Sequence, residues 1–259
     1  MSTPPADRPG SRYFIGASSK AYLGERATYD WLNGIRAELD ARPQLSERGI
    51  TAFVIPSAPL LVPAREILAG SGCLIGAQDA HWSSGAATGG VSTALLAELG
   101  ISLVELGHAE RRRDFRETDD DIARKVRAAL DDGLVPLLCI GETDAVPAQD
   151  AASFCIGQVR SAVRGAADLG RTILAYEPVW AIGADRPASS DHVNSVLSMI
   201  RAGLIAELGT TPLAEIYGGS AGPGTLVPLV EADGLFLGRF AHDPANFGVV
   251  LDDALALVA

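Results

Sequence analysis

Eight short apolar runs recur along the chain, separated by longer segments that carry helix-type spacing. Runs that are continuously apolar, rather than alternating with polar residues, predict parallel strands buried on both faces. The sequence therefore predicts a series of strand–helix units. The eight predicted strands are Tyr13–Gly16, Thr51–Ile55, Leu74–Ala77, Leu103–Leu106, Val135–Ile140, Thr172–Ala175, Glu215–Tyr217 and Leu235–Leu237.

The segments between the runs have the periodicity of amphipathic helices. In Asp120–Leu130, apolar residues recur every fourth position, and His192–Leu208 is a second helical segment. Eight such units within about 250 residues match a single α/β domain, the closed (β/α)8 TIM barrel. An open, doubly wound sheet is the alternative. We expect one domain over residues 12–259, preceded by a flexible tail at residues 1–11.

The charge balance and the cysteines limit the function classes. The net charge of −11 disfavours a general affinity for nucleic acid or an anionic membrane, so an anionic substrate would need a local positive pocket. Three widely spaced cysteines in apolar surroundings indicate reduced thiols rather than a disulfide framework, which favours a cytoplasmic location. No signal peptide and no apolar run of membrane-spanning length is recognisable.

A carboxylate follows the sixth run, in the segment Glu177–Gly183 (EPVWAIG). Proline restricts the backbone beside Glu177, and Trp180 could shield the carboxylate from water, so Glu177 is a candidate general base. The backbone N–H of Gly183 could close on an anion. From these residues alone, a tight turn with a solvated carboxylate is the alternative.

A histidine follows the fourth run, in the segment Gly107–Arg112 (GHAERR). At the start of a helical turn, His108 would face the positive end of that turn, which predicts a neutral ring able to polarise a carbonyl. A structural histidine bonded to the backbone is the alternative here.

Glycine-rich segments follow the seventh and eighth runs, at Tyr217–Gly224 (YGGSAGPG) and Leu237–Phe240 (LGRF). Glycines let backbone amides approach a phosphate closely, and a phosphate site at this place is common in such barrels. The glycine spacing does not fit a dinucleotide fingerprint. HExxH, CxxC and Walker A motifs are absent, so zinc hydrolysis, dithiol redox chemistry and nucleotide-triphosphate binding have no support in the sequence.

Taken in chain order, Lys20 after the first run, the GHAERR segment, EPVWAIG and YGGS closely resemble the triosephosphate isomerase family. The fragment Leu138–Glu142 (LCIGE) also fits, and the match runs from about Tyr13 to the C-terminus. The resemblance implies a homodimeric barrel that isomerises a sugar phosphate without metal or cofactor.

The resemblance also implies a role for each matching residue. Glu177 would be the base that moves a proton between adjacent carbons and His108 the neutral electrophile, the pairing by which this family's mechanism is generally explained. Lys20 would lie near the phosphate and the oxyanion, and Glu110 would orient it. The backbone amides of Gly183, Ser220, Gly238 and Arg239 would hold the phosphate, and Ala181–Ser189 would form a lid.

The chain departs from the usual family pattern at four places. Ser18 and Ser19 stand where ordinary members have Asn-Trp, and Arg239 replaces the second phosphate glycine. The lid reads Gly183-Ala184-Asp185-Arg186-Pro187 instead of Gly-Thr-Gly-Lys-Thr, with a proline expected to stiffen its trailing end. The dimer loop reads Thr88-Gly89-Gly90 in place of Thr-Gly-Glu.

The small Ser18 leaves space where a three-carbon substrate ends. L-Erythrulose 1-phosphate has one more hydroxymethyl group on the carbon that loses its proton, and the same chemistry would give D-erythrulose 4-phosphate. A branch of the family with small residues before the lysine and a Gly-Arg-Phe segment is associated with such tetrulose phosphates in erythritol-type catabolism. We predict this four-carbon isomerase. The alternatives are triosephosphate isomerase and, more remotely, an inactive sugar-phosphate-binding protein.

Overall fold

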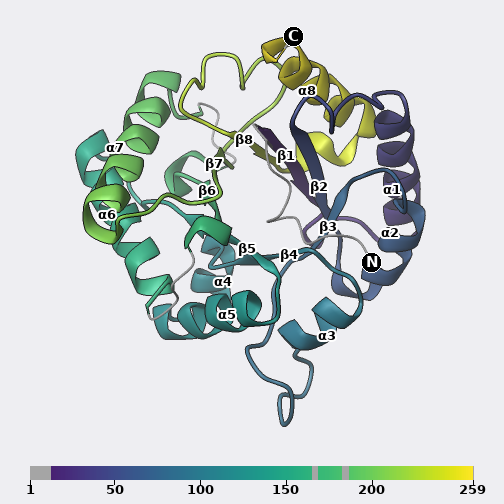
Figure 1. Ribbon diagram of the computed structural model, residues 1–259, viewed down its shortest axis with the longest axis horizontal. Coiled ribbons are helices and arrows are strands. Elements are labelled where there is room, and N and C mark those ends of the chain that lie inside the picture. Colours follow the sequence, from purple (N-terminus) through teal and green to yellow (C-terminus); the bar gives the residue numbers. More distant parts are fainter. Residues whose placement is uncertain (1–12, 165–168, 183–186, 259) are drawn as a thin grey trace.

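The strands of the computed structural model, which describes residues 13–164, 169–182 and 187–258, close into one parallel barrel. They follow one another around the barrel in sequence order, and β8 pairs with β1 (Figure 1). The predicted closed barrel is confirmed, whereas the predicted tail at residues 1–11 lies outside the described residues. The strands are β1 (Tyr13–Ser18), β2 (Ile50–Ile55), β3 (Leu74–Ala77), β4 (Leu103–Leu106), β5 (Val135–Ile140), β6 (Ile173–Tyr176), β7 (Ala214–Tyr217) and β8 (Gly234–Leu237).

The strand bounds differ most from the prediction at β1. This strand continues two residues beyond Gly16 because Ala17 and Ser18 pair with Val54 and Ile55 of β2. Ser18 is therefore part of the barrel wall rather than of the loop that follows. The bounds predicted for β3, β4 and β5 agree with the structure.

Helices surround the barrel on its outside (Figure 1). The predicted helix at residues 120–130 is α5, whose first turn is closed by a capping box between Thr118 and Asp121. Single turns of 3-10 helix precede or follow several strands. The α-helices are α1 (Glu25–Asp40), α2 (Leu61–Ile67), α3 (Thr93–Glu98), α4 (Ala109–Asp114), α5 (Asp119–Asp131), α6 (Ala148–Ala162), α7 (Ser190–Leu208) and α8 (Pro244–Leu257), and the 3-10 turns include η4 (Val179–Ala181) and η5 (Arg239–His242). None of these described helices is long and apolar enough to cross a membrane.

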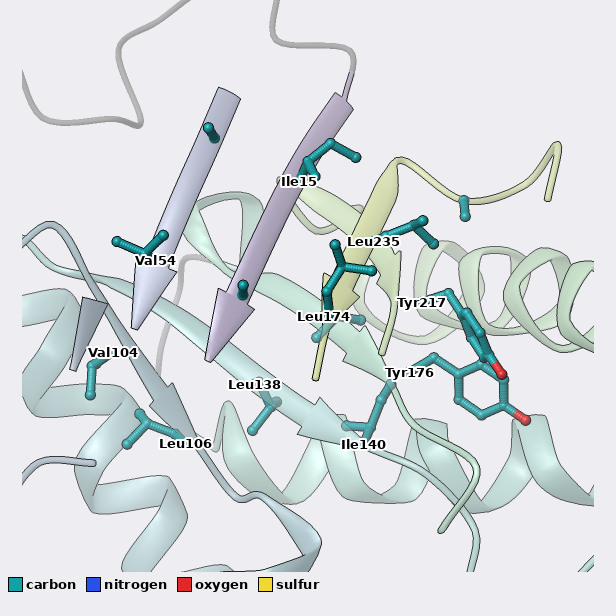
Figure 2. Close-up of a cluster of buried hydrophobic side chains, with 14 of the residues drawn as sticks. Ile15, Val54, Val104, Leu106, Leu138, Ile140, Leu174, Tyr176, Tyr217 and Leu235 are labelled. Atoms are coloured by element: carbon teal, nitrogen blue, oxygen red, sulfur yellow. The ribbon is translucent and has the colours of Figure 1, made fainter. Parts of the chain in front are cut away.

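Two hydrophobic clusters lie on the two faces of the barrel wall. The inner cluster fills the barrel, with Phe53 and Phe236 stacked at a ring-centroid distance of 5.7 Å. Gly16 makes room for this filling, since a Cβ there would lie 2.0 Å from the Phe53 ring. The outer cluster joins the strands to the helices and includes Val104, Leu106, Leu138 and Ile140 (Figure 2). With both faces packed, the chemistry must lie at the ends of the strands.

Candidate active site

A cavity of about 640 Å³ opens at the carboxyl ends of the strands. Segments that follow five different strands contribute to its lining, which is how a parallel barrel brings together residues far apart in sequence. The predicted site residues that line it are Ser18, Lys20, His108, Glu110, Glu177, Ser220, Gly238 and Arg239. Gly183, predicted to bind phosphate, lies outside the described residues, as does the part of the predicted lid at residues 183–186.

Lys20 reaches the cavity from a strained turn after β1. Its φ of 44° lies in the left-handed region, which is costly for a residue with a side chain. Its carbonyl oxygen accepts hydrogen bonds from Ser57 Oγ at 3.0 Å and from Gln78 Nε2 at 2.9 Å, and these bonds hold the turn. The strain is thus localised at a residue whose side chain faces the cavity.

The ammonium group of Lys20 donates to Oε1 of Glu110 at 2.8 Å. Burial lowers the pKa of Lys20, but the hydrogen bond and charge of Glu110 outweigh it, so the net pKa is raised. The same bond lowers the pKa of Glu110. Both groups are therefore charged at neutral pH, and a fixed positive charge lies in the cavity of an acidic protein.

His108 caps the N-terminus of α4. Its Nδ1 accepts the backbone N–H of Glu110 at 3.1 Å, so this nitrogen carries no proton. Nε2 lies 3.2 Å from Oε2 of Glu177 and 3.3 Å from Nζ of Lys20.

Two influences act on the protonation of His108. Burial lowers the pKa of the ring, whereas the Glu177 carboxylate beside Nε2 raises it, to about 9. Protonation of Nδ1 would nevertheless break the bond from the Glu110 amide and set two N–H groups against each other. We therefore assign the neutral ring with its proton on Nε2, which donates to Glu177.

Glu177 is buried at the end of β6, and two glycines make its place. Its backbone N–H donates to the Ile140 carbonyl at 2.8 Å. A Cβ on Gly141 would lie 1.9 Å from the Glu177 carbonyl oxygen, and one on Gly218 would lie 2.6 Å from Cγ of its side chain. The position of this carboxylate thus depends on a glycine directly after each of the two neighbouring strands, β5 and β7.

Glu142 anchors the segment that follows Glu177. Its Oε1 accepts hydrogen bonds from Trp180 Nε1 at 2.7 Å and from the Tyr176 hydroxyl at 3.1 Å. Across the cavity rim, Ser220 Oγ donates to the Ala181 carbonyl at 3.1 Å, which ties the segment after β7 to the one after β6. Trp180, predicted as a shield for the base, also serves as an anchor.

Arg239 extends the cavity beyond the glycine-rich turns. It follows Gly238 at the start of η5, and its guanidinium lies over the ring of Tyr22, 5.6 Å from the centroid. Tyr22 also lines the cavity. A second cationic side chain therefore lies beside the turn predicted to hold phosphate.

Sequence reasoning missed the residues that hold the site rather than form it. Gln78 and Ser57 fix the Lys20 carbonyl, and Glu142 fixes Trp180. Gln78 directly follows β3, at the same rim as the other site residues. The sequence could have predicted a role for Gln78, because it is a polar residue directly after a strand. No comparable pattern in the sequence predicted a role for Ser57.

The closed (β/α)8 barrel carries at one rim a lysine, a histidine and a buried glutamate, the kinds of group that proton transfer on an anionic substrate requires. The chain belongs to the triosephosphate isomerase family, whose family model matches residues 13–254. It is an isomerase of this family.

Relatives with two different names match nearly the whole chain. A protein named L-erythrulose-1-phosphate isomerase from Pectobacterium atrosepticum is 44% identical over 94% of this chain and 96% of its own length. A triosephosphate isomerase from a Synechococcus strain is 35% identical over 84% of this chain and 92% of its own. The crystal structure of triosephosphate isomerase from Bartonella henselae matches with a TM-score of 0.80 and 29% identity, over 94% of this chain and 99% of that one.

We predict that Gly218→Ala impairs catalysis by displacing Glu177. The new Cβ would meet the Glu177 side chain at 2.6 Å, and a shift of about 1 Å in a reacting group can cost about 100-fold in rate. Steady-state kinetics on a sugar phosphate should show this loss in kcat. Gly222→Ala is the matched control, because its Cβ meets only the Phe240 ring at an ordinary 3.7 Å. Full activity in Gly218→Ala would contradict the assigned geometry.

Proposed function

We propose that this protein interconverts L-erythrulose 1-phosphate and D-erythrulose 4-phosphate through an enediolate, with no metal or cofactor. The observation that carries the choice of substrate is the small, buried Ser18 in the cavity wall beside Lys20. A larger polar residue at this place would occupy the space that a fourth carbon needs. Relatives named L-erythrulose-1-phosphate isomerase in three further organisms, 36–38% identical, support the same choice.

The proposed reaction begins with proton removal by Glu177. The carboxylate takes the proton from C3 of the ketose, and negative charge develops on the oxygen at C2. Lys20 and the Nε2–H of His108 stabilise this charge as it forms. Substrate would take the place of the direct His108–Glu177 contact, so both groups would turn from each other to the reacting atoms.

The second half of the reaction returns the proton to the neighbouring carbon. His108 moves protons between the two enediolate oxygens, and Glu177 gives its proton to C2, beside the carbon that bears the phosphate. The carbonyl is now at C3, which is C2 of D-erythrulose 4-phosphate. The amides of Gly183, Ser220, Gly238 and Arg239 are proposed to hold the phosphate while the other carbons rearrange.

Triosephosphate isomerase is the second candidate, because the same base and acid would serve dihydroxyacetone phosphate. The relative of that name from the Synechococcus strain supports it. An inactive sugar-phosphate sensor has less support, since Lys20, His108 and Glu177 are all retained and His108 lies within hydrogen-bonding distance of both of the others.

We predict that kcat/KM for L-erythrulose 1-phosphate exceeds that for glyceraldehyde 3-phosphate by about tenfold or more, as expected for a pocket fitted to one extra carbon. Turnover of both substrates, measured side by side, tests this. Ser18→Asn should lower the ratio by filling the added space, and an unchanged ratio would count against Ser18. A triose preference would reject the four-carbon proposal. Binding without turnover of either substrate would indicate a sensor.

We further propose that the Arg239 side chain binds the substrate phosphate. Arg239→Ala should raise KM about three- to tenfold with little change in kcat, because phosphate is held equally in the ground and transition states. Arg48→Ala removes the same charge at the opposite end of the barrel, before β2, and should leave KM unchanged. A KM that is equally insensitive to both changes would show that the Arg239 side chain does not contact the phosphate.

We infer a homodimer and a cytoplasmic location. The loop between β3 and α3, residues 78–92, projects from the barrel (Figure 1), and the family's dimer loop corresponds to this segment. Gly90 lacks the family's carboxylate, but Asp79 of the same loop pairs with Arg111 at 2.7 Å and with Lys125 at 2.6 Å. Arg111 is therefore paired with a carboxylate of this loop within one chain.

Light scattering after size exclusion should give twice the 26.9 kDa mass of the chain. Gly90→Glu should not be required for association, because Asp79 already supplies a carboxylate to Arg111. A monomer at micromolar concentration that becomes a dimer only in Gly90→Glu would contradict this inference.

A further inference from the structure

Glu105 is a buried carboxylate beneath the active site to which the proposed reaction gives no task. Its neighbours Val104 and Leu106 belong to the outer cluster (Figure 2). Leu103 belongs to the inner one. Because side chains alternate along a strand, Glu105 shares the inner face with Leu103. It is 4% exposed, and its Oε2 has no hydrogen-bond partner within the described part of the chain.

The groups that interact electrostatically with Glu105 are those of the site. They come from four strands: Lys20 follows β1, His108 and Glu110 follow β4, Cys139 belongs to β5, and Glu177 follows β6. Burial raises the pKa of Glu105 to about 7; Lys20 opposes the rise, Glu177 and Glu110 add to it, and His108 would oppose it only in its protonated form. Burial also raises the pKa of the Cys139 thiol, and Glu177 and Glu105 raise it further, so Cys139 stays neutral.

A charge count explains why the state of Glu105 matters. Three cationic side chains line the cavity, Lys20, Arg113 and Arg239, together with two carboxylates, Glu110 and Glu177. An ionised Glu105 would add a third negative charge beneath a site that is proposed to accept a phosphate dianion. Two carboxylates that share a buried site resist ionising together, and both repel an incoming anion.

We propose that Glu105 supports the site in its uncharged form. Its ionisation lowers the affinity of the site for doubly charged phosphate groups. This rests on the proposed function, since it takes a phosphate ester as substrate. When Glu105 is neutral, its side chain does not weaken the attraction of the dianion to Lys20 and Arg239. With Glu105 ionised, part of that attraction is cancelled by a charge that no hydrogen bond to Oε2 stabilises.

Glu215 offers a matched control. It is also buried, and burial likewise raises its pKa to about 7, but it lies between the inner-facing Ala214 and Ile216 and pairs with Arg201 at 2.7 Å. Its side chain therefore faces outward, away from the cavity. Its titration should affect stability but not anion binding.

Sulfate is the probe of choice because it is a dianion throughout the relevant pH range and needs no turnover. Titration calorimetry should show its Kd in the wild-type protein rising about three- to tenfold from pH 6 to pH 9, because ionisation of Glu105 adds one buried like charge beneath the bound anion. Glu105→Gln should abolish most of this rise, and Glu105→Leu, an apolar substitution, should do the same. Glu215→Gln should keep it.

Thermal unfolding supplies a second measurement. A raised pKa means that the folded state binds the proton more tightly, so Glu105 costs stability as pH rises from about 4.5 through about 7. The Tm of Glu105→Gln relative to wild type should therefore increase between pH 5 and pH 8.

An equal rise of the sulfate Kd in wild type and both Glu105 variants would overturn the proposal, as would a Tm difference that does not vary with pH. Failure to isomerise either sugar phosphate, with the sulfate difference intact, would reject the proposed substrate while leaving the role of Glu105 in place. The two ideas therefore fail separately.

Discussion

Closure of the barrel is the constraint on which the rest of the structure depends. It requires β8 to reach β1, and Gly234 makes this possible, since a Cβ there would lie 1.8 Å from the Phe14 carbonyl oxygen and its φ of 144° suits only glycine. Closure leaves no sheet edge, fills the interior with apolar side chains, and turns all strand ends that carry the chemistry to one rim. Lys20, His108 and Glu177 meet because of this geometry, although 157 residues separate the first from the last.

At this rim, the protein concentrates a positive charge that its overall composition opposes. The net charge of −11 would repel a sugar phosphate, yet the ammonium of Lys20 is fixed in the cavity by a left-handed backbone and by three side chains that bind its carbonyl oxygen, those of Ser19, Ser57 and Gln78. Glu110 keeps that lysine charged, because its hydrogen bond and charge outweigh the effect of burial on the pKa of Lys20. Local placement, rather than net charge, therefore determines what the site can bind.

Most of the barrel and the reacting groups could be predicted from the sequence, because buried parallel strands read as apolar runs and the site residues occur at their ends. The first predicted strand ends at Gly16, two residues too early, since the strand pairing with Ile55 that extends β1 to Ser18 is a property of the closed sheet. Glu105 was hidden inside the run Leu103–Leu106, where one carboxylate among leucines and valine does not change the strand prediction. Which face it occupies, and what lies above it, depend on tertiary packing. The neutral state predicted for His108 is supported by a backbone bond at Nδ1 that no spacing rule could supply.

The choice between a three-carbon and a four-carbon substrate shows that a shared reaction mechanism does not determine which substrate an enzyme prefers. The base, the electrophile and the phosphate are common to both candidates, so discrimination must come from residues that do no chemistry. Space beside Ser18 contributes about 1–3 kcal/mol at most, the usual limit for one extra carbon in a pocket. Stronger selection requires a hydrogen bond that only the fourth carbon's hydroxyl can make, and the Ser18 hydroxyl can donate one while it still accepts its 3.3 Å bond from the Lys20 amide. Substitution of Ser18 by a small apolar residue would thus keep the space and lose the bond, which separates the two contributions.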